Sequence, residues 1–318
     1  MLKKISIRKI MVSSLALFAL LLIYIMPDKQ ENNYSLSKNN INYVYDNAKE
    51  VIYTLDKNNL VARATIKGYN NNIEEKIKNN IESLIIEGKN SNLIPNGFRP
   101  ILPSGTEILN LDLKDKVLTI NFSNELLDIN EEYEEEMIES IIYTLTSIEG
   151  IEKVIIKVEG KTLEKLPQSG KILKTVLDKN YGINKTYDIA SPYNIDTYTV
   201  YYVSKYKNEE YYVPVTKYVN NENKDKIKVI IDELSSSPTY ENNLMSYVNK
   251  DINLINYKLE NEILTLNFDN SLYSNNTQIL EEVIYAISLS LNDNYNIKEI
   301  VFKVNNKEIY KKNTKTIE

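Results

Sequence analysis

The sequence predicts an α+β fold of two tandem repeats, each a small sheet with two helices on one face, behind an N-terminal membrane anchor. Three observations predict it: an uncharged apolar run at residues 10–26, a long internal match between the two halves, and the same alternation of strand-like and helix-like patterns in both. The 318 residues are enough for two such domains.

The N-terminal segment has the pattern of a membrane anchor. Four basic residues and no acidic residue lie in residues 1–9, and the run from Ile10 to Met26 follows them. Its 17 residues are at the short end of the ~17–25 that span a bilayer. The basic residues favour a cytoplasmic N-terminus. A cleavable signal peptide is the alternative, although the small residues of a cleavage site are absent before Pro27. Either way, we expect the body of the protein to be exported.

The internal repeat defines the domains. The segment Leu111–Leu163 matches Tyr257–Ile309 at one offset of 146, with 17 identities in 53 positions. Upstream, Ile77 corresponds to Ile227 at an offset of 150, so the copies differ in one loop. Each copy is long enough for its own core. The expected segments are a cytoplasmic basic tail (1–9), a transmembrane anchor or signal peptide (10–27), a flexible spacer (28–47), a first domain (48–166), a linker (167–197), a second domain (198–312) and a tail (313–318).

Each copy reads as strand, strand, helix, strand, strand, helix, strand. The first two strands are β-branched and aromatic runs, and Pro214 in the second copy favours an edge position. The first helix has apolar residues at three- and four-residue spacing. The expected first two strands and helix are residues 51–55, 60–65 and 73–85 in the first copy, and residues 200–203, 211–216 and 227–234 in the second.

The second half of each copy has equally clear patterns. Two strands alternate apolar and polar residues, a second apolar-faced helix follows, and a nearly all-apolar strand is predicted to be central and covered on both faces. Glu159-Gly160 and Asn305-Asn306 then read as two-residue turns into a return strand. The linker is expected to hold one helical turn at residues 172–177. These elements are residues 109–113, 118–122, 137–145 and 154–158, repeated at 264–268, 283–291 and 300–304.

Composition excludes several kinds of site. The chain has no His, Cys or Trp, which excludes Ser-His-Asp and Cys-His catalysis, the usual zinc sites and disulfides. Its 8 Gly are too far apart for a phosphate-binding loop. The net charge of −6, acidic beyond the N-terminal segment, disfavours nucleic acid as a partner. We therefore expect no enzyme activity, no cofactor and no metal.

A family resemblance rests on the first copy. Residues 101–109 contain a Pro-Ser-Gly-Thr turn, and the strand at 117–123 follows; this arrangement resembles the GerMN domain of the GerM family of sporulation and spore germination proteins. Tandem copies behind a membrane-targeting N-terminus are also that family's layout. The second copy departs from it, with Val248–Ile252 in place of the turn, and the chain has no lipobox Cys. The resemblance implies ring-building-motif-like domains, a structural role in endospore formation, and no catalytic residues to carry over.

Three functional hypotheses follow. The first is a single-pass membrane protein with extracytoplasmic C-terminal domains, acting without catalysis as an assembly or scaffold component of a transenvelope sporulation complex. Its partners would be other sporulation membrane and envelope proteins, the membrane through residues 10–26, and, as an open alternative, further copies of itself. The second is an extracytoplasmic cell-wall or glycan-binding module. The third is a carboxylate-dependent hydrolase acting on wall polymer.

Three groups of residues are candidates for these roles. A tyrosine cluster in the second copy is the best candidate for an interface with a protein or glycan, although sheet preference also accounts for tyrosine there. An acidic run could bind a cation or supply a pair of catalytic carboxylates, but acids also favour the first turn of a helix. Recurrent asparagines are expected to bond nearby backbone in a turn. The groups are Tyr201, Tyr202, Tyr206, Tyr211, Tyr212 and Tyr218; Glu131, Glu132, Glu134, Glu135 and Glu136; and Asn121, Asn124, Asn267 and Asn270.

Overall fold

The computed structural model describes residues 36–37, 49–68, 72–220, 225–236, 243–273 and 279–314. The chain divides into two units, Met1–Ser35 and Leu36–Glu318, and the elements below belong to the second unit. The expected anchor at 10–27 and nearly all of the spacer at 28–47 lie outside the described residues. Among the residues that the structure describes, no helix has the length and apolar character needed to cross a membrane.

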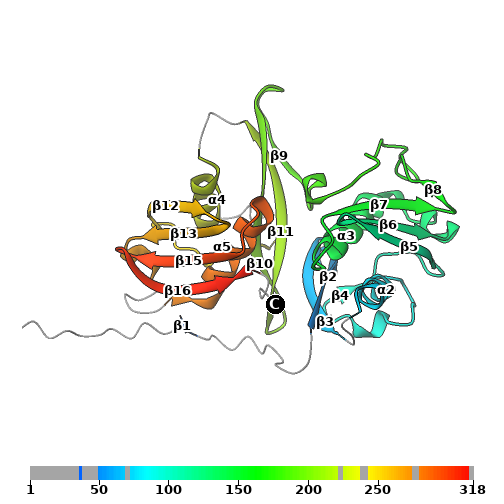
Figure 1. The fold of residues 1–318 in the computed structure, drawn as a ribbon, viewed down its shortest axis with the longest axis horizontal. Helices are drawn as coiled ribbons and strands as arrows, with labels where there is room; N and C mark the ends of the chain where they lie inside the picture. Colours follow the sequence, from blue (N-terminus) through cyan, green and yellow to red (C-terminus); the bar gives the residue numbers. More distant parts are fainter. Residues whose placement is uncertain are drawn as a thin grey trace, which may run out of the picture. The chain divides into compact units, whose positions relative to one another are not determined.

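The first repeat contains two separate sheets (Figure 1). A hairpin joins a short third strand in the order β3-β2-β4, and a four-stranded sheet has the order β5-β6-β7-β8. Asn72 begins the first helix by accepting a hydrogen bond from the amide of Glu74. The elements are β2 (Lys49–Asp56), β3 (Val61–Lys67), α2 (Ile73–Ser83), β4 (Phe98–Arg99), β5 (Ile108–Lys114), β6 (Val117–Phe122), α3 (Glu134–Thr146), β7 (Lys153–Val158) and β8 (Lys161–Thr162).

The second repeat also has a three-stranded and a four-stranded sheet, but its hairpin is longer and the short third strand pairs in parallel with the second hairpin strand. Its sheets have the orders β10-β11-β9 and β12-β13-β15-β16, and Asp225 begins its first helix. The elements are β9 (Thr186–Asp188), β10 (Ile195–Tyr206), β11 (Glu209–Asn220), α4 (Lys226–Ser235), β12 (Leu254–Glu260), β13 (Ile263–Phe268), β14 (Ile279–Leu280), α5 (Glu281–Asn294), β15 (Glu299–Val304) and β16 (Lys307–Asn313). The backbone of β14 pairs in parallel with β1 (Leu36–Ser37).

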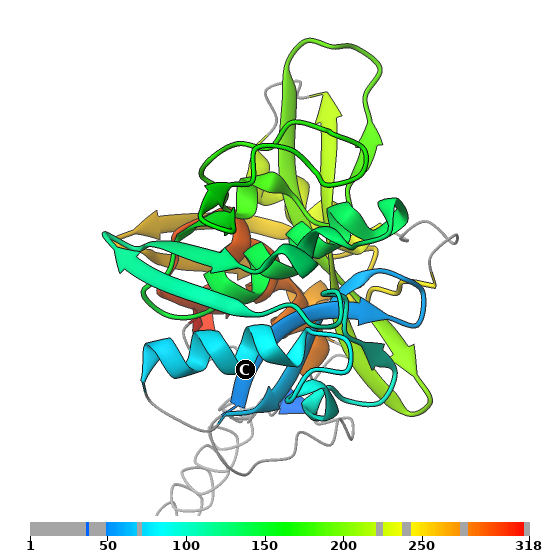
Figure 2. The same cartoon turned by 90° about the vertical axis from the view of Figure 1, so that its right-hand side faces the viewer.

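The expectation of one small sheet with both helices on one face is wrong. In the first repeat, α3 lies between the β2–β3 hairpin and the four-stranded sheet (Figure 1), and α2 lies along the same hairpin (Figure 2). The reason is that every residue from Met137 to Leu145 of α3 is buried, and a helix buried on all sides needs a layer on each. In the second repeat α5 is buried in the same way from Glu282 to Leu291 and packs against β10.

The last strand of each repeat lies inside its sheet, as expected. It pairs in parallel with the strand before the helix, β6 with β7 and β13 with β15. The expected burial on both faces is wrong for β7, where Val154, Ile156 and Val158 are buried while Lys153 is exposed and Lys157 half-buried on the other face. The turns after β7 and β15 are confirmed as two-residue turns, with positive φ at both central residues of each.

The linker packs against the first repeat instead of forming a free connection. The expected helical turn at 172–177 is wrong: Val154 and Leu177 exchange backbone hydrogen bonds of 2.8 and 2.9 Å, which holds this stretch extended. The helical turn occurs later, as the 3₁₀ helix Lys179–Tyr181. Leu173 and Leu177 are buried, so the apolar residues of this stretch pack in an extended conformation.

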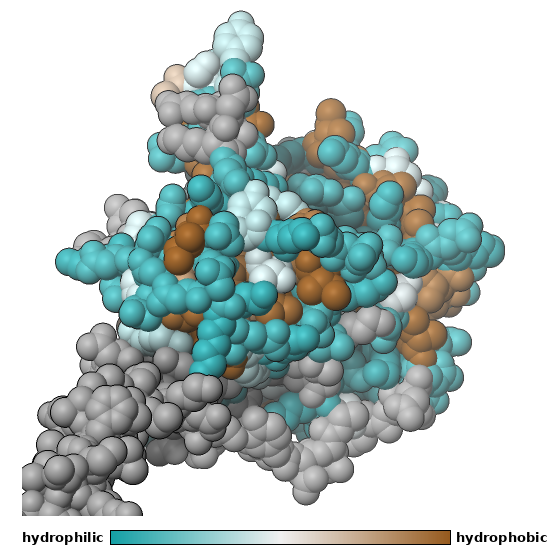
Figure 3. All heavy atoms as spheres, turned by 60° about the vertical axis from the view of Figure 1, so that its left-hand side comes forward, coloured by the Kyte–Doolittle hydropathy of each residue, from teal (hydrophilic) through white to brown (hydrophobic). Residues whose placement is uncertain are grey.

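The edge strands β5 and β12 carry the same features in both repeats. Each has a bulge at an equivalent residue, Leu109 or Ile255, and each carries an exposed lysine–carboxylate pair. Bulges and charges are the features by which edge strands avoid pairing with another chain. On the face drawn in Figure 3, hydrophobic residues form separate small patches in a hydrophilic surface. Assembly through these edges is therefore not favoured.

Candidate functional site

The junction between the repeats is built around two equivalent tyrosines, Tyr53 on β2 and Tyr201 on β10. In each repeat the second helix supplies a hydroxyl that accepts a 2.8 Å hydrogen bond from the tyrosine amide: Thr144 for Tyr53 and Ser290 for Tyr201. The two phenol oxygens are 2.9 Å apart. The repeats thus meet through the same residue on both sides, as in a two-fold interface.

A buried ion pair extends this contact. The Tyr201 hydroxyl donates to Asp293 Oδ2 over 2.5 Å, and Lys179 Nζ lies 2.5 Å from Asp293 Oδ1. Burial, reinforced by the Asp293 charge, raises the pKa of Tyr53 and of Tyr201. Burial alone would lower the pKa of Lys179, but the Asp293 carboxylate outweighs it and the pKa is raised. The linker lysine therefore stays charged and joins the two repeats.

Asn184 of the linker connects both hairpins. Its Oδ1 accepts from the Val61 amide over 2.9 Å, and its Nδ2 donates to the carbonyls of Val61 and Pro214, 2.7 Å each. Its φ of 45° is one that asparagine tolerates better than most residues. Beside it, Tyr211 donates to Asp56 over 2.9 Å, and Ala62 packs with Tyr211 and Val213. The junction thus combines an apolar core with satisfied polar groups.

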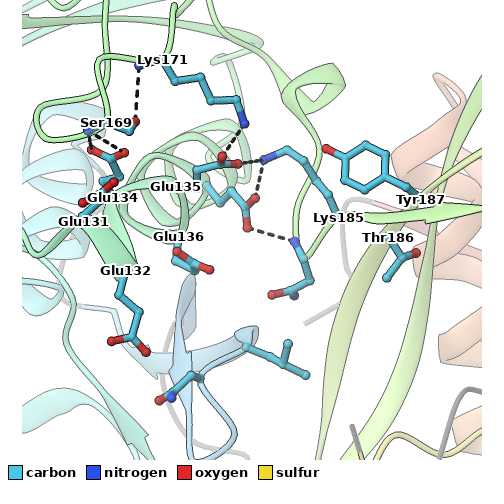
Figure 4. Close-up of a pocket in the computed structure, with 14 residues that line it drawn as sticks. Glu131, Glu132, Glu134, Glu135, Glu136, Ser169, Lys171, Lys185, Thr186 and Tyr187 are labelled. Carbon is cyan, nitrogen blue, oxygen red and sulfur yellow. Dashed lines mark hydrogen bonds and ion pairs between the residues drawn. The ribbon is translucent and has the colours of Figure 1, made fainter. Parts of the chain in front are cut away.

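An acidic pocket lies where the linker meets the start of α3 (Figure 4). Its volume is about 620 Å³, and six glutamates and two lysines are among the residues that line it. The sequence brings these acids together because the 3₁₀ helix Glu131–Tyr133 runs directly into α3 (Glu134–Thr146), whose first turn favours negative charge. The run expected at a helix start is therefore confirmed in that position.

Several of these carboxylates hold the linker in place. Glu134 is buried and accepts from the amides of Gln168 and Ser169, over 2.8 and 3.2 Å. Lys171 and Lys185 both bind Glu135 (Figure 4). Burial would raise the pKa of Glu135, but the two lysines outweigh it and the pKa is lowered.

Glu139 is a second buried acid of the pocket. One oxygen lies 2.6 Å from Lys185 Nζ, and the other accepts from the Asn184 amide over 2.9 Å. Burial raises its pKa to about 7, against the opposing charge of Lys185. Burial also raises the pKa of Glu136. No group of three or more acidic side chains in the described ranges is placed to hold a metal ion. The arrangement fixes a segment of the linker against the start of α3.

The six tyrosines expected at an interface occupy different environments. Four are buried, and Tyr206 and Tyr218 are half-buried. Tyr201 and Tyr211 contact the first repeat, so they form an interface within the chain. Tyr202 bonds Glu233, and Tyr212 stacks on Tyr285. The four buried side chains are Tyr201, Tyr202, Tyr211 and Tyr212, which face the interior and are not available to an outside partner.

The recurrent asparagines have the structural role expected, with a different partner. Asn121 Oδ1 accepts from the Gly160 amide and Asn267 Oδ1 from the Asn306 amide, 2.8 Å in each case. Gly160 and Asn306 are the second residues of the two turns after β7 and β15. The bonds therefore fix the turn of the neighbouring strand, instead of the strand-to-helix turn that the sequence suggested.

Sequence reasoning missed the residues that carry the junction: Tyr53, Asn184 and Asp293. Tyr53 and Tyr201 stand at the same place in the two first strands, which was a usable signal, because equivalent residues are those that meet in a symmetric contact. For Asn184 and Asp293, lying in a linker and at a helix end, the sequence pattern gave no signal.

The chain matches known proteins over most of its length. The Germane family model, described as sporulation and spore germination, matches residues 43–164 and 199–310. The spore germination protein GerM of Bacillus subtilis (strain 168) is 32% identical over 263 residues, 80% of this chain and 71% of that protein. The solved structure of the tandem GerMN domains of the sporulation protein GerM from Bacillus subtilis is similar with a TM-score of 0.76 and 31% identity, over 82% of this chain and 92% of that one.

Proposed function

The chain belongs to the Germane family of sporulation and spore germination proteins, and from this membership we propose that it is a non-enzymatic assembly component of a transenvelope sporulation complex. The observation that carries the proposal is the junction of Tyr53 with Tyr201. Two domains that bury polar contacts against each other present their outer surfaces at a fixed spacing. A fixed spacing suits a component that positions partners.

The location and partners are part of the same proposal. Residues 10–26 hold the protein to the membrane, with residues 1–9 cytoplasmic and both domains outside the cytoplasm. The partners are other sporulation membrane and envelope proteins.

The acidic pocket is the main reason to consider an enzyme, and its chemistry favours a structural role. Glu134, Glu135 and Glu139 each bind a named group of the linker. These bonds to the linker account for the positions of the three carboxylates without a substrate. Glu131, Glu132 and Glu136 remain as the pocket acids that a hydrolase could use.

The test is a count of heat-resistant spores in the organism that carries this gene. A deletion strain is complemented with the wild-type chain, with the triple variant Glu131→Gln, Glu132→Gln, Glu136→Gln, or with residues 28–318 exported through a cleavable signal peptide. Immunoblots establish that each chain is present at the wild-type level.

We expect the deletion to lower the count, and the wild type and the triple variant to restore it. The chain without an anchor should restore it poorly. If the triple variant accumulates normally and behaves like the deletion, the pocket has a chemical role and the non-enzymatic assignment is wrong. If the deletion does not change the count or germination, the sporulation role itself is wrong.

A further inference from the structure

A second pocket lies in the second repeat and adjoins the acidic pocket along β9, where Tyr187 lines the acidic pocket and Asp188 lines the second one. It has a volume of about 320 Å³ and is formed by strands β9, β10 and β11 together with the first turn of α4. This size is at the lower end of the range of pockets that hold small ligands.

Strand register defines the geometry of its floor. Val219 on β11 is opposite Asp188 on β9 and opposite Asp196 on β10, so the three residues form one row across the sheet. Residues in such a row point to the same face. With strands about 4.8 Å apart, the Cα atoms of the two aspartates are about 10 Å apart on either side of the apolar Val219. The floor is thus apolar in the middle, with a carboxylate at each rim; Asp196 Oδ1 also accepts from the Thr197 amide over 2.8 Å, and Tyr198 lines the pocket beside it.

The remaining walls add apolar surface and a donor. Val229 and Lys226 lie one turn apart on α4, so both face the sheet, and Ala190 closes the pocket from the β9–β10 loop. Two carboxylates and one ammonium therefore surround a floor of small aliphatic side chains.

The loop at the mouth is held in a fixed conformation by one side chain. Asn220 Oδ1 accepts from the amides of Ala190 and Ser191, over 2.7 and 2.9 Å. Its Nδ2 donates to the carbonyls of Ser191 and Tyr193, over 2.7 and 2.8 Å. Tyr193, in this loop, is 76% exposed. Tyrosine is enriched at binding surfaces, where its ring contacts apolar groups while its hydroxyl stays in water.

We propose that this pocket binds a pyranose ring of a glycan chain. A pyranose has an apolar C–H face and a rim of hydroxyls, which match the Val219 and Val229 floor and the Asp188, Asp196 and Lys226 rim. Hydroxyls donate to carboxylates and accept from an ammonium, so both kinds of rim group are used. The extended glycan chain would continue past the exposed Tyr193. The inference goes beyond the assembly role, and either can fail without the other.

The test is isothermal titration of the full chain in a detergent without a sugar headgroup. The probes are chitotetraose, which carries N-acetyl groups, cellotetraose, which does not, and spermidine, which tests whether the pocket is only a cation trap. The variants are Asp188→Ala and Asp196→Ala. The matched control is Asp112→Ala, which removes an exposed aspartate from the edge strand β5. Thermal unfolding establishes that each variant is folded.

We expect both sugars to bind, and each pocket variant to weaken binding about 10-fold or more, as for the loss of a hydrogen bond to a charged group. The control should bind within twofold of the wild type. Tighter binding of chitotetraose than of cellotetraose would identify an N-acetylated wall polymer as the source of the ring. The proposal is overturned if neither sugar binds at millimolar concentration, if spermidine binds and the sugars do not, or if both aspartate variants bind as the wild type does. Should Asp196→Ala unfold, Asp188→Ala decides alone.

Discussion

The hydroxyl of Tyr53 lies 2.9 Å from the hydroxyl of Tyr201, the residue at the equivalent place in the second repeat. A contact between equivalent residues relates the two repeats approximately by a two-fold axis, as in a homodimer whose subunits became one chain. The linker completes this contact. Asn184 donates to Val61 of the first repeat and to Pro214 of the second. Lys179 forms an ion pair with Asp293 of the second repeat, and its carbonyl accepts from Tyr143 of the first. The linker is therefore part of the junction.

Removing the two hydroxyls should reveal coupling between the repeats. Tyr53→Phe loses one hydrogen bond and should lower the free energy of unfolding by about 0.5–1 kcal/mol. Tyr201→Phe also removes a donor from Asp293 and should cost about 1.5–3 kcal/mol. In a double-mutant cycle followed by denaturant unfolding, we expect a coupling of about 0.5–1 kcal/mol. Tyr193→Phe, at a side chain that is 76% exposed, is the control, and additive effects of the two junction variants would contradict the contact.

Asn184→Asp tests the donor side of the linker amide. The substitution keeps the shape, the tolerance of positive φ and the acceptor for Val61 N–H. It removes both donor bonds and places a carboxylate beside the carbonyls of Val61 and Pro214. We expect a loss of about 2–4 kcal/mol in the free energy of unfolding. Asn110→Asp, exposed on β5, should change it by less than about 0.5 kcal/mol, and an equal effect at both sites would refute this role.

Glu139 should make stability depend on pH. Its pKa is about 7 in the folded state and near the ordinary value of 4.5 when unfolded. Between these values the folded state holds the extra proton, so this group's contribution to stability falls as pH rises from about 4.5 to 7. Relative to Glu139→Gln, the wild type should lose up to about 3 kcal/mol between pH 4 and pH 8. Denaturant titrations of both proteins across this range check it; a difference independent of pH would contradict it.

Asn80 should be a site where the protein can be stabilised. It is fully buried on α2, and neither atom of its amide has a hydrogen-bond partner. The second repeat has Ile230 at the equivalent position, also fully buried. Asn80→Leu, of similar shape, should therefore raise the free energy of unfolding by about 1–2 kcal/mol. Thermal unfolding measures it. The exposed change Asn110→Leu should not stabilise, and a loss of stability at Asn80 would mean that a bound water satisfies the amide.

The sequence predicted most elements because local patterns determine them. Alternating residues in β6 and β13 and the acidic start of α3 each identified an element, since these patterns reflect one buried face or one helix end. The division of each repeat into two sheets was missed, because strand pairing depends on contacts distant in sequence. The sequence of α3 held a sign of the second sheet: the side of the helix away from its most apolar face carries the small side chains Ser140 and Thr144, and both are buried.

The candidate site was predictable only in part. The acidic run was located correctly, but its partners Lys171, Asn184 and Lys185 come from a linker without periodicity. The number of tyrosines makes the cluster a candidate interface, although sheet preference also accounts for them. The burial of Tyr201 and Tyr211 involves contacts with the first repeat, and a pattern within one repeat contains no information about that contact.

The central claim is that the two repeats behave as one body through this junction. The chain has no Trp, so a single Trp at Leu109 or at the equivalent Ile255, both about half exposed, reports on one repeat at a time. The most direct measurement is denaturant unfolding of the Leu109→Trp and Ile255→Trp chains followed by fluorescence. The account predicts coincident midpoints, which separate when Asn184→Asp is added. Separate midpoints without that change would contradict it, because the repeats would then unfold independently.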